Sequence, residues 1–358
     1  MKFPLMVAGA EKLVSIWRRK FVYWMTLGIC LSSILASCGL GFNPNQNNIE
    51  LTLVSFAVTR AAYENIIPQF TQTWQKEHHQ NVIINQSYGG SGSQTRAVLD
   101  GLDADIVALA LALDVKKIQQ AGLIEPGWEE ELPNNSIVHK SVAAIVTREG
   151  NPKNIKNWTD LVKPEIQVIT ANPKTSGGAK WNFLALWGSI TKNGGNEEQA
   201  LEFITKIFQN APVLPRDARE ASDVFFNQEQ GDALINYENE IILAANHGEK
   251  LPYIVPEINI SIDNPVAVVD KNVNKHKNRQ VAEAFLQYLF TPTAQKEFAK
   301  VGFRSIDTAI SNEVGQDFPQ VDKLLTIQDF GGWNQVQDKF FADGGIFDKV
   351  ENAVANKS

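Results

Sequence analysis

Cysteine is nearly absent from this chain of 358 residues, which contains only Cys30 and Cys38. Two cysteines cannot build the disulfide framework of a small secreted domain, and they cannot supply a cysteine-rich zinc site. The five histidines lack the spacing of metal ligands, and no H-E-x-x-H motif occurs. We therefore expect no metal site in this protein.

Motifs of common enzymes are also missing. No serine stands in a G-x-S-x-G elbow, and the run Gly89-Gly90-Ser91-Gly92 lacks the Gly-Lys-Ser/Thr ending of a P-loop. A dinucleotide fingerprint that starts at Gly90 would need a third glycine where the chain has Thr95. These absences argue against a nucleotide hydrolase and a dinucleotide-dependent oxidoreductase, and we predict no catalytic residues and no cofactor.

Positive charge is scarce outside the amino terminus. The whole chain has a net charge of −7, but residues 1–37 contain five basic residues and one acid. The remainder therefore carries 28 basic and 39 acidic residues, a net charge of −11. Nucleic acids bind basic surfaces, so this balance argues against a nucleic-acid partner. The length corresponds to about two domains of ordinary size.

The amino terminus has the pattern of a secretory leader. Arg18-Arg19-Lys20 precedes the uncharged run Phe21–Ser37, which ends in Leu35-Ala36-Ser37-Cys38 and resembles a bacterial lipobox. We predict a signal peptide over residues 1–37, a lipid on Cys38, and a flexible tether over 38–48. The expected location is the periplasm, with possible anchoring to the membrane. A cleaved leader with a chance cysteine and an uncleaved anchor are the alternatives.

The rest of the chain alternates between β-rich and helical patterns, which indicates an α/β fold with a mainly parallel sheet. Strands are expected at Leu51–Phe56, Val82–Gln86, Asp105–Ala110, Val168–Thr170 and Ala233–Asn236, and helices at Arg60–Glu77, Val115–Ala121, Ala179–Ile190 and Glu197–Phe208. Two separate parts of the chain each contain a strand, a Gly/Ser-rich loop and a helix. Two lobes with facing loops would form a cleft, the usual place for a small ligand.

The two Gly/Ser-rich loops, Gly89–Gly92 and Ser176–Gly178, carry the functional signal. A helix start offers unpaired N–H groups and partial positive charge, and glycine lets the backbone approach a ligand closely. Neither loop contains an acid that could accept a proton from the ligand. Such a donor-only site favours a fully ionised oxyanion such as sulfate over phosphate. Ordinary turn and capping chemistry is the alternative.

Longer motifs add a family resemblance. The run Asn172-Pro173-Lys174-Thr175-Ser176-Gly177-Gly178-Ala179-Lys180 closely resembles a signature of bacterial periplasmic sulfate-binding proteins, which usually end it with Arg. Gln86–Gly92 and Phe330–Trp333 fit the same family, and Pro215–Glu220 resembles its cyanobacterial branch. The similarity covers essentially residues 50–350.

The resemblance implies a two-lobed periplasmic-binding-protein fold of type II with a ligand cleft between the lobes. We expect residues 49–138 and 259–350 to form lobe 1 and residues 139–258 to form lobe 2. Members of the family deliver their ligand to the membrane permease subunits of an ABC transporter and are not enzymes. We accordingly expect a monomeric sulfate receptor.

In the family, backbone N–H groups, a serine hydroxyl and an indole N–H hold a dehydrated sulfate, with no cationic side chain in contact. The corresponding residues here are Ala57, Ser91, Ser176, Gly177, Gly178, Ala218 and Tyr237. Ala57 stands where enteric receptors carry an Asp, which leaves the N–H intact. Tyr237 replaces the indole donor, so the choice between sulfate and thiosulfate stays open, and Arg219 is expected in a supporting role. Molybdate or phosphate binding, and hydrolysis of sulfate or phosphate esters, are further alternatives.

Overall fold

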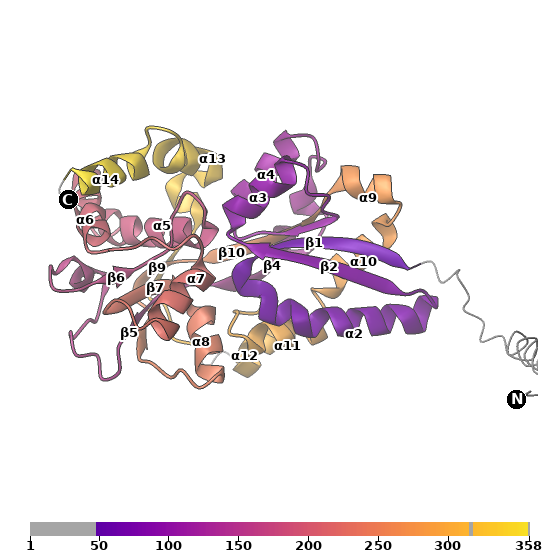
Figure 1. Cartoon of the computed structure of the whole chain (residues 1–358), viewed down its shortest axis with the longest axis horizontal. Helices are drawn as coiled ribbons and strands as arrows, with labels where there is room; N and C mark the ends of the chain where they lie inside the picture. The colour runs from indigo at the N-terminus through magenta and orange to yellow at the C-terminus, as the bar shows by residue number, and fades with distance from the viewer. Residues whose placement is uncertain (1–47, 315–317, 357–358) are drawn as a thin grey trace, which may run out of the picture. The chain divides into compact units, whose positions relative to one another are not determined.

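Two larger β-sheets and a two-stranded one organise the chain in a computed structural model that describes residues 48–314 and 318–356 (Figure 1). The predicted signal peptide, Cys38 and nearly all of the predicted tether lie outside the described residues. From Asn48 onward the chain forms one compact unit by its internal contacts. No helix in the described ranges is long and apolar enough to cross a membrane.

The first sheet has five strands in the order β2-β1-β3-β10-β4. Their bounds are β1 Ile49–Phe56, β2 Val82–Gly89, β3 Ile106–Ala108, β4 Ile137–Ser141 and β10 Ile262–Val268. Helices around this sheet are α2 Arg60–His78, α3 Ser91–Leu99, α4 Ala112–Gln120, α9 Asp270–His276, α10 Arg279–Tyr288 and α11 Pro292–Lys300. Apolar residues at helical spacing on α2, among them Tyr63, Ile66 and Phe70, are buried in the core that this sheet shares with the helices.

The second sheet has four strands in the order β6-β7-β5-β8. Their bounds are β5 Ala143–Thr147, β6 Val168–Ile169, β7 Ala233–Tyr237 and β8 Tyr253–Ile254. The accompanying helices are α5 Gly177–Thr191, α6 Glu197–Gln209, α7 Ala218–Ser222 and α8 Glu238–Asn246. Every residue of α5 from Gly177 to Ser189 is buried, which fits a helix that is apolar nearly all round and covered on all sides.

Both sheets are mixed, so the prediction of a mainly parallel sheet was wrong. Strand β1 runs parallel to β2 and β3, but β10 is antiparallel to β3 and to β4. In the second sheet β5 is antiparallel to β7 and β8, whereas β6 is parallel to β7. The chain leaves the first sheet between Ser141 and Ala143 and re-enters it at Ile262, so the returning strand runs in the opposite direction. Strand-helix alternation does not encode that direction.

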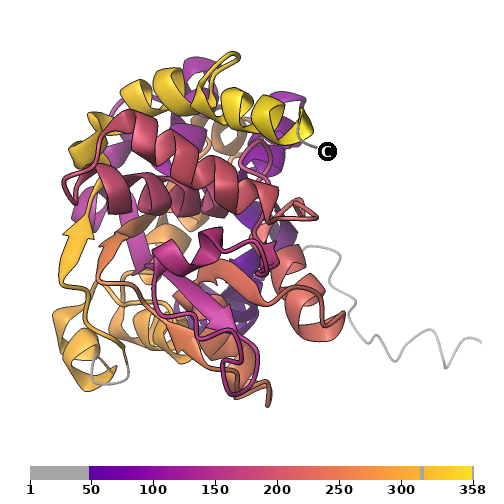
Figure 2. The ribbon, with the colours of Figure 1, turned by 90° about the vertical axis from the view of Figure 1, so that its left-hand side faces the viewer.

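The carboxyl-terminal segment packs on the second lobe, unlike the expected grouping of residues 259–350 with lobe 1. Strand β11 (Lys323–Leu325) pairs with β9 (Ile258–Ile260), and α14 (Ile346–Ala355) packs along α6 (Figures 1 and 2). Phe340 and Phe347 lie within 6.0 Å of Phe183 on α5, measured between ring centroids. This placement buries both rings against α5, which stabilises the carboxyl-terminal segment on the second lobe. Residues 262–300 supply β10 to the first sheet and α11, which packs on α2.

Candidate anion-binding site

Helical segments from both lobes begin around one small cavity. The short turn η1 (Ala57–Thr59) leads into α2, and α3, α5, α7 and α8 start at the same place. The cavity is lined by Phe56, Ala57, Val58, Gly89, Gly90, Ser91, Ala110, Ser176, Gly177, Gly178, Asp217, Ala218 and Tyr237. The structure thus brings together all of the residues predicted to hold the ligand. The free volume of this cavity is small, about 10 Å³.

Backbone N–H groups supply much of its lining. Ser91, Gly177 and Ala218 are the first residues of α3, α5 and α7, and Gly178 is the second residue of α5. These positions have no acceptor within their own helix. No acceptor for their N–H groups lies among the residues that the structure describes. The partial positive charge of the helix starts therefore points at the cavity.

The two serines of the site use their hydroxyl groups differently. Ser176 caps α5, and its Oγ accepts a hydrogen bond from the N–H of Ala179 at 3.3 Å, so its own proton stays free for a ligand. The Ser91 hydroxyl accepts from the N–H of Ala110 at 3.0 Å and donates to Asp114 Oδ2 at 2.6 Å. Ser91 can then offer a ligand only its backbone N–H.

Tyr237 is buried at the end of β7, and its hydroxyl has no hydrogen-bond partner in the described part of the chain. Burial raises the pKa of this phenol well above 10, and the charges of Glu240 and Asp114 raise it further. The hydroxyl therefore keeps its proton and can donate. A Cβ added to Gly178 would stand 2.4 Å from the Tyr237 ring, so this contact requires glycine.

Glycines also allow the loops of the two lobes to meet. A Cβ on Gly90 would lie 2.6 Å from the carbonyl oxygen of Thr175 and 3.1 Å from that of Arg216. A Cβ on Gly177 would lie 2.6 Å from the Cβ of Ala110 on the opposite lobe. These three distances are shorter than ordinary van der Waals contacts, so a larger side chain at either position would force the lobes apart.

Charged groups surround the cavity without placing a cation in its lining. Asp217 caps α7 by accepting from the N–H of Glu220 at 2.9 Å, and its other oxygen lies 3.8 Å from Arg216 Nε. Arg219 donates to Glu240 Oε1 at 2.7 Å, which matches the supporting role expected for it. Burial is the main cause that raises the pKa of Glu240 to about 7, and Arg219 opposes the shift.

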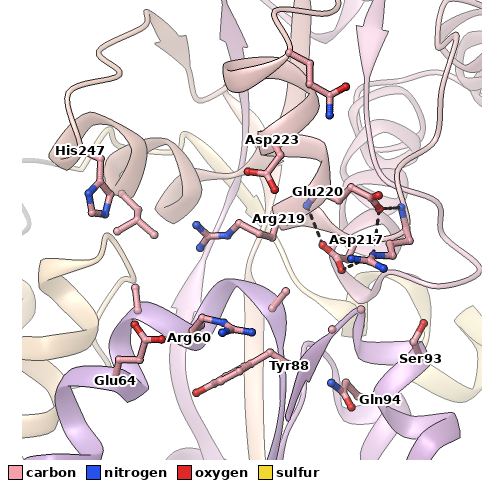
Figure 3. A pocket seen from close by; sticks show the side chains of 17 residues that line it. Arg60, Glu64, Tyr88, Ser93, Gln94, Asp217, Arg219, Glu220, Asp223 and His247 are labelled. Atoms are coloured by element: carbon pink, nitrogen blue, oxygen red, sulfur yellow. Dashed lines mark hydrogen bonds and ion pairs between the residues drawn. The ribbon is translucent and has the colours of Figure 1, made fainter. Parts of the chain in front are cut away.

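A larger pocket of about 770 Å³, here called the vestibule, opens beside the cavity (Figure 3). It shares Ala57, Gly89, Gly90 and Asp217 with the cavity and is lined by both lobes. Its lining contains both arginines and acids, namely Arg60, Arg216, Arg219, Glu64, Asp217, Glu220 and Asp223. Arg60 holds its guanidinium 4.7 Å from the centre of the Tyr88 ring.

Sequence reasoning did not find Asp114 or Arg60. Asp114 lies 23 positions after Ser91, in a helix that shows no Gly/Ser signal of its own, and only the folded chain brings the two together. Within the described ranges no three His, Cys, Asp or Glu side chains gather as metal ligands.

Comparison with known proteins places the chain in a family. The model of the bacterial extracellular solute-binding proteins matches residues 51–304. The chain belongs to this family. The "Sulfate-binding protein" of Synechococcus elongatus is 55% identical over 95% of this chain and 98% of its own length. The "Thiosulfate-binding protein" of Pseudomonas aeruginosa is 38% identical over 89% of this chain and 97% of its own.

A solved structure extends the comparison to three dimensions. The sulfate-binding protein SubI from Mycobacterium tuberculosis H37Rv matches with a TM-score of 0.75 and 36% identity, over 82% of this chain and all of that one. The family resemblance and the two-lobed α/β fold of the periplasmic-binding type are confirmed. So is the prediction that this chain is a binding protein rather than an enzyme, and its family is extracellular.

Proposed function

We propose that this protein is an extracytoplasmic receptor that binds sulfate between its two lobes and delivers it to an ABC-type permease. The observation that carries the proposal is the Tyr237 hydroxyl, which is buried and unpartnered at the wall of a cavity formed by helix starts. A buried donor without an acceptor costs free energy, about 1–3 kcal/mol. An anion in the cavity would accept from Tyr237 and from the N–H groups around it.

The donors favour a fully ionised tetrahedral anion. We assign the contacts to the backbone N–H groups of Ala57, Ser91, Gly177, Gly178 and Ala218 and to the hydroxyls of Ser176 and Tyr237. Phosphate at neutral pH retains a proton that needs an acceptor. Asp217, the acid in the lining, is turned towards the N–H of Glu220 and towards Arg216 (Figure 3). The names of the Synechococcus and Mycobacterium relatives support sulfate.

Thiosulfate is the second candidate ligand. A phenol hydroxyl at Tyr237 can donate to an oxygen but is a single donor with one direction, and thiosulfate replaces one oxygen of sulfate by a larger sulfur. The Pseudomonas relative is named for thiosulfate. Competition between the two anions in a calorimetric titration ranks them.

Thermal melting of the protein, stripped of bound anions, tests the proposed function. Sulfate at 100 times its dissociation constant should stabilise the folded state by about 2.7 kcal/mol. Phosphate and molybdate at equal concentration should give smaller shifts. Absence of a shift with any of the four anions sulfate, thiosulfate, phosphate and molybdate would show that the helix starts serve only the fold.

We further propose that the mature protein acts as a monomer, held at the membrane in the periplasm by a lipid on Cys38 and docked to the permease when loaded. The leader pattern of the sequence supports the lipid, and the extracellular family supports the location. Mass spectrometry of the mature amino terminus, compared with the Cys38→Ser variant, tests it. An unmodified terminus in the native host would overturn the lipid anchor.

A further inference from the structure

A hydrogen bond crosses from one lobe to the other directly behind the cavity. The indole N–H of Trp181, on α5 of the second lobe, donates to the carbonyl oxygen of Ala110 at 2.8 Å. Ala110 follows β3 of the first lobe, and its side chain lines the cavity. Asn264 on β10, also in the first lobe, donates to the same oxygen at 3.0 Å. All three residues are buried.

Trp181 has a fixed position relative to the N–H donors at the start of α5, because both belong to the same helix. It stands four residues after Gly177, so it lies on the same face of α5 one turn further along. Gly177 itself packs against Ala110 and Leu111, the segment that receives the indole. Since α5 is a buried, regular helix, its N–H donors and the Trp181 side chain move together. The hydrogen bond to Ala110 therefore forms when α5 reaches the anion.

Opening the lobes breaks this bond but does not leave the Ala110 oxygen without a donor, because Asn264 remains. The Trp181 bond thus adds free energy only to the closed arrangement. On the other side, the Trp181 ring meets Trp333 edge-on, with centroids 4.7 Å apart and planes at 76°. Trp333 belongs to α13 (Gly332–Val336), which contacts α4 of the first lobe. The indole is held in its donating orientation by the Trp333 ring, which lies on the same lobe.

We propose that Trp181 is a positioning residue that holds the two lobes closed over the bound anion without touching it. The bond must break before the lobes open, so Trp181 lowers the dissociation rate of the anion. It does not change the association rate. The inference rests on the proposed function, since it needs an anion that closes the lobes.

The variant Trp181→Phe tests this by keeping an aromatic ring and removing the N–H. A neutral hydrogen bond contributes about 0.5–1.5 kcal/mol, so sulfate affinity should fall roughly two- to tenfold. Stopped-flow measurements should place that factor in the dissociation rate and leave the association rate unchanged. Without ligand, the Trp181→Phe variant should melt close to the wild-type protein, because the proposal places this hydrogen bond only in the closed, loaded protein.

Trp158→Phe is a matched control. The Trp158 indole also donates to a backbone carbonyl, that of Ile258, at 3.0 Å, and is equally buried. Donor and acceptor both lie on the second-lobe side, because Ile258 is in β9, which packs on α5. The same atoms are removed and a similar gap is left, but no bond between the lobes is lost. Sulfate affinity should match that of the unchanged protein.

The wild-type titration separates the two proposals. If the wild-type protein binds none of the four anions, the proposed function fails and this inference falls with it. If the wild-type protein binds sulfate and Trp181→Phe behaves like Trp158→Phe in affinity and dissociation rate, only the inference about Trp181 is overturned.

A second measurement tests the proposal on the wild-type protein, in case the Trp181→Phe variant does not fold. Hydrogen exchange of the Trp181 indole N–H can be followed by NMR in the wild-type protein, with the signal assigned through the other Trp→Phe variants. Protection that appears only with sulfate supports the proposal. Equal protection with and without sulfate would overturn it, because the bond would then belong to the fold and not to closure.

Discussion

The hydroxyl of Ser91 donates to Asp114 Oδ2 at 2.6 Å, and both side chains are fully buried. The same hydroxyl accepts from the N–H of Ala110. Ser91 therefore divides its polar groups between two tasks: the hydroxyl joins α3 to α4, and the N–H faces the cavity. This division separates the effects expected from substituting the two serines of the site.

Ser91→Ala should lower stability more than affinity. The change removes the hydrogen bonds that Asp114 Oδ2 and the Ala110 N–H make in a buried place, at a cost of about 1–3 kcal/mol, although Lys117 Nζ still lies 3.7 Å from Asp114 Oδ1. The backbone N–H that we assign to the ligand remains. Denaturant unfolding without ligand should show the loss, and calorimetry should show a smaller change in sulfate affinity than Ser176→Ala causes.

Ser176→Ala should lower affinity more than stability. The Ser176 proton is free for the ligand, and a hydrogen bond to a charged group contributes about 1.5–3 kcal/mol, so sulfate binding should weaken roughly tenfold to a hundredfold. Loss of the cap on α5 should cost only about 1 kcal/mol of unfolding free energy. Unchanged affinity in a calorimetric titration would remove Ser176 from the site.

Tyr237→Phe should have opposite effects on the free and the loaded protein. Without ligand, the variant loses a buried hydroxyl that has no partner, so its unfolding free energy should stay equal or rise. With sulfate it loses a donor, and affinity should fall. Melting curves with and without sulfate measure both. A lower melting temperature of the ligand-free variant would show that the hydroxyl serves the fold.

Gly90→Ala should impair closure rather than folding. The added Cβ would stand 2.6 Å from the Thr175 carbonyl oxygen on the other lobe, whereas within its own lobe Gly90 has an ordinary negative φ that alanine also adopts. Sulfate affinity should fall at least tenfold while the ligand-free melting temperature changes little. Equal affinity of the variant and the wild type would mean that the loops separate without loss of the site.

The sequence signal for this candidate site is local. Gly/Ser runs at helix starts identify N–H donors within a few residues, and the structure gathers Ser91, Ser176 and their neighbours around one cavity. Asp114 and Trp181 could not be found in this way, since their partners lie 23 and 71 positions away and depend on how the sheets pack. The direction of β10 and the position of the carboxyl-terminal helices likewise follow from tertiary contacts that no short pattern records.

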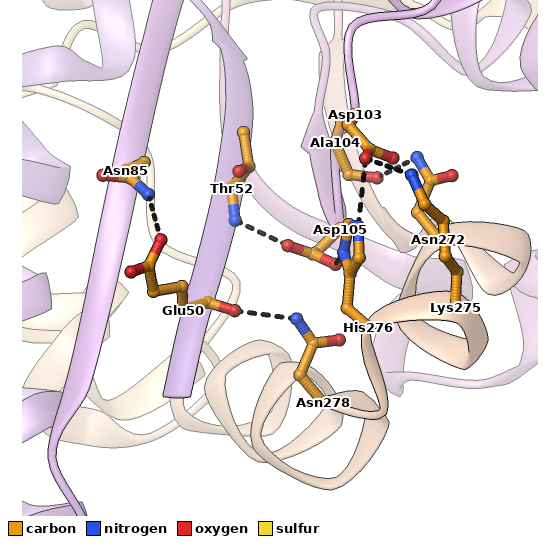
Figure 4. A network of polar contacts seen from close by, with 10 residues as sticks. All are labelled: Glu50, Thr52, Asn85, Asp103, Ala104, Asp105, Asn272, Lys275, His276 and Asn278. Atoms are coloured by element: carbon orange, nitrogen blue, oxygen red, sulfur yellow. Dashed lines mark hydrogen bonds and ion pairs between the residues drawn. The ribbon is translucent and has the colours of Figure 1, made fainter. Parts of the chain in front are cut away.

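A last prediction concerns His276, on α9 beside the start of β3 (Figure 4). Its Nδ1 lies 2.7 Å from Asp105 Oδ1 and its Nε2 lies 3.0 Å from Asp103 Oδ2, to which Lys275 also donates. Asp105 in turn accepts from the N–H of Thr52 on β1. The hydrogen bond to Asp105 is the main cause that raises the pKa of His276, and Asp103 adds to it.

A raised pKa in the folded state means that the protonated imidazole stabilises the fold. This contribution is complete below the unfolded-state pKa, about 6.5, and is lost as pH rises through the higher folded-state pKa. The unfolding free energy of the wild-type protein should therefore exceed that of His276→Gln most at pH 6 and below. The difference should shrink as the imidazole deprotonates at higher pH.

The contributions of other titrating groups to the unfolding free energy, such as that of buried Glu240, cancel in this comparison because both proteins contain them. Denaturant unfolding of the two proteins between pH 5.5 and 8.5 measures the difference, and a constant gap across that range would show that the imidazole charge does not tie α9 to the sheet.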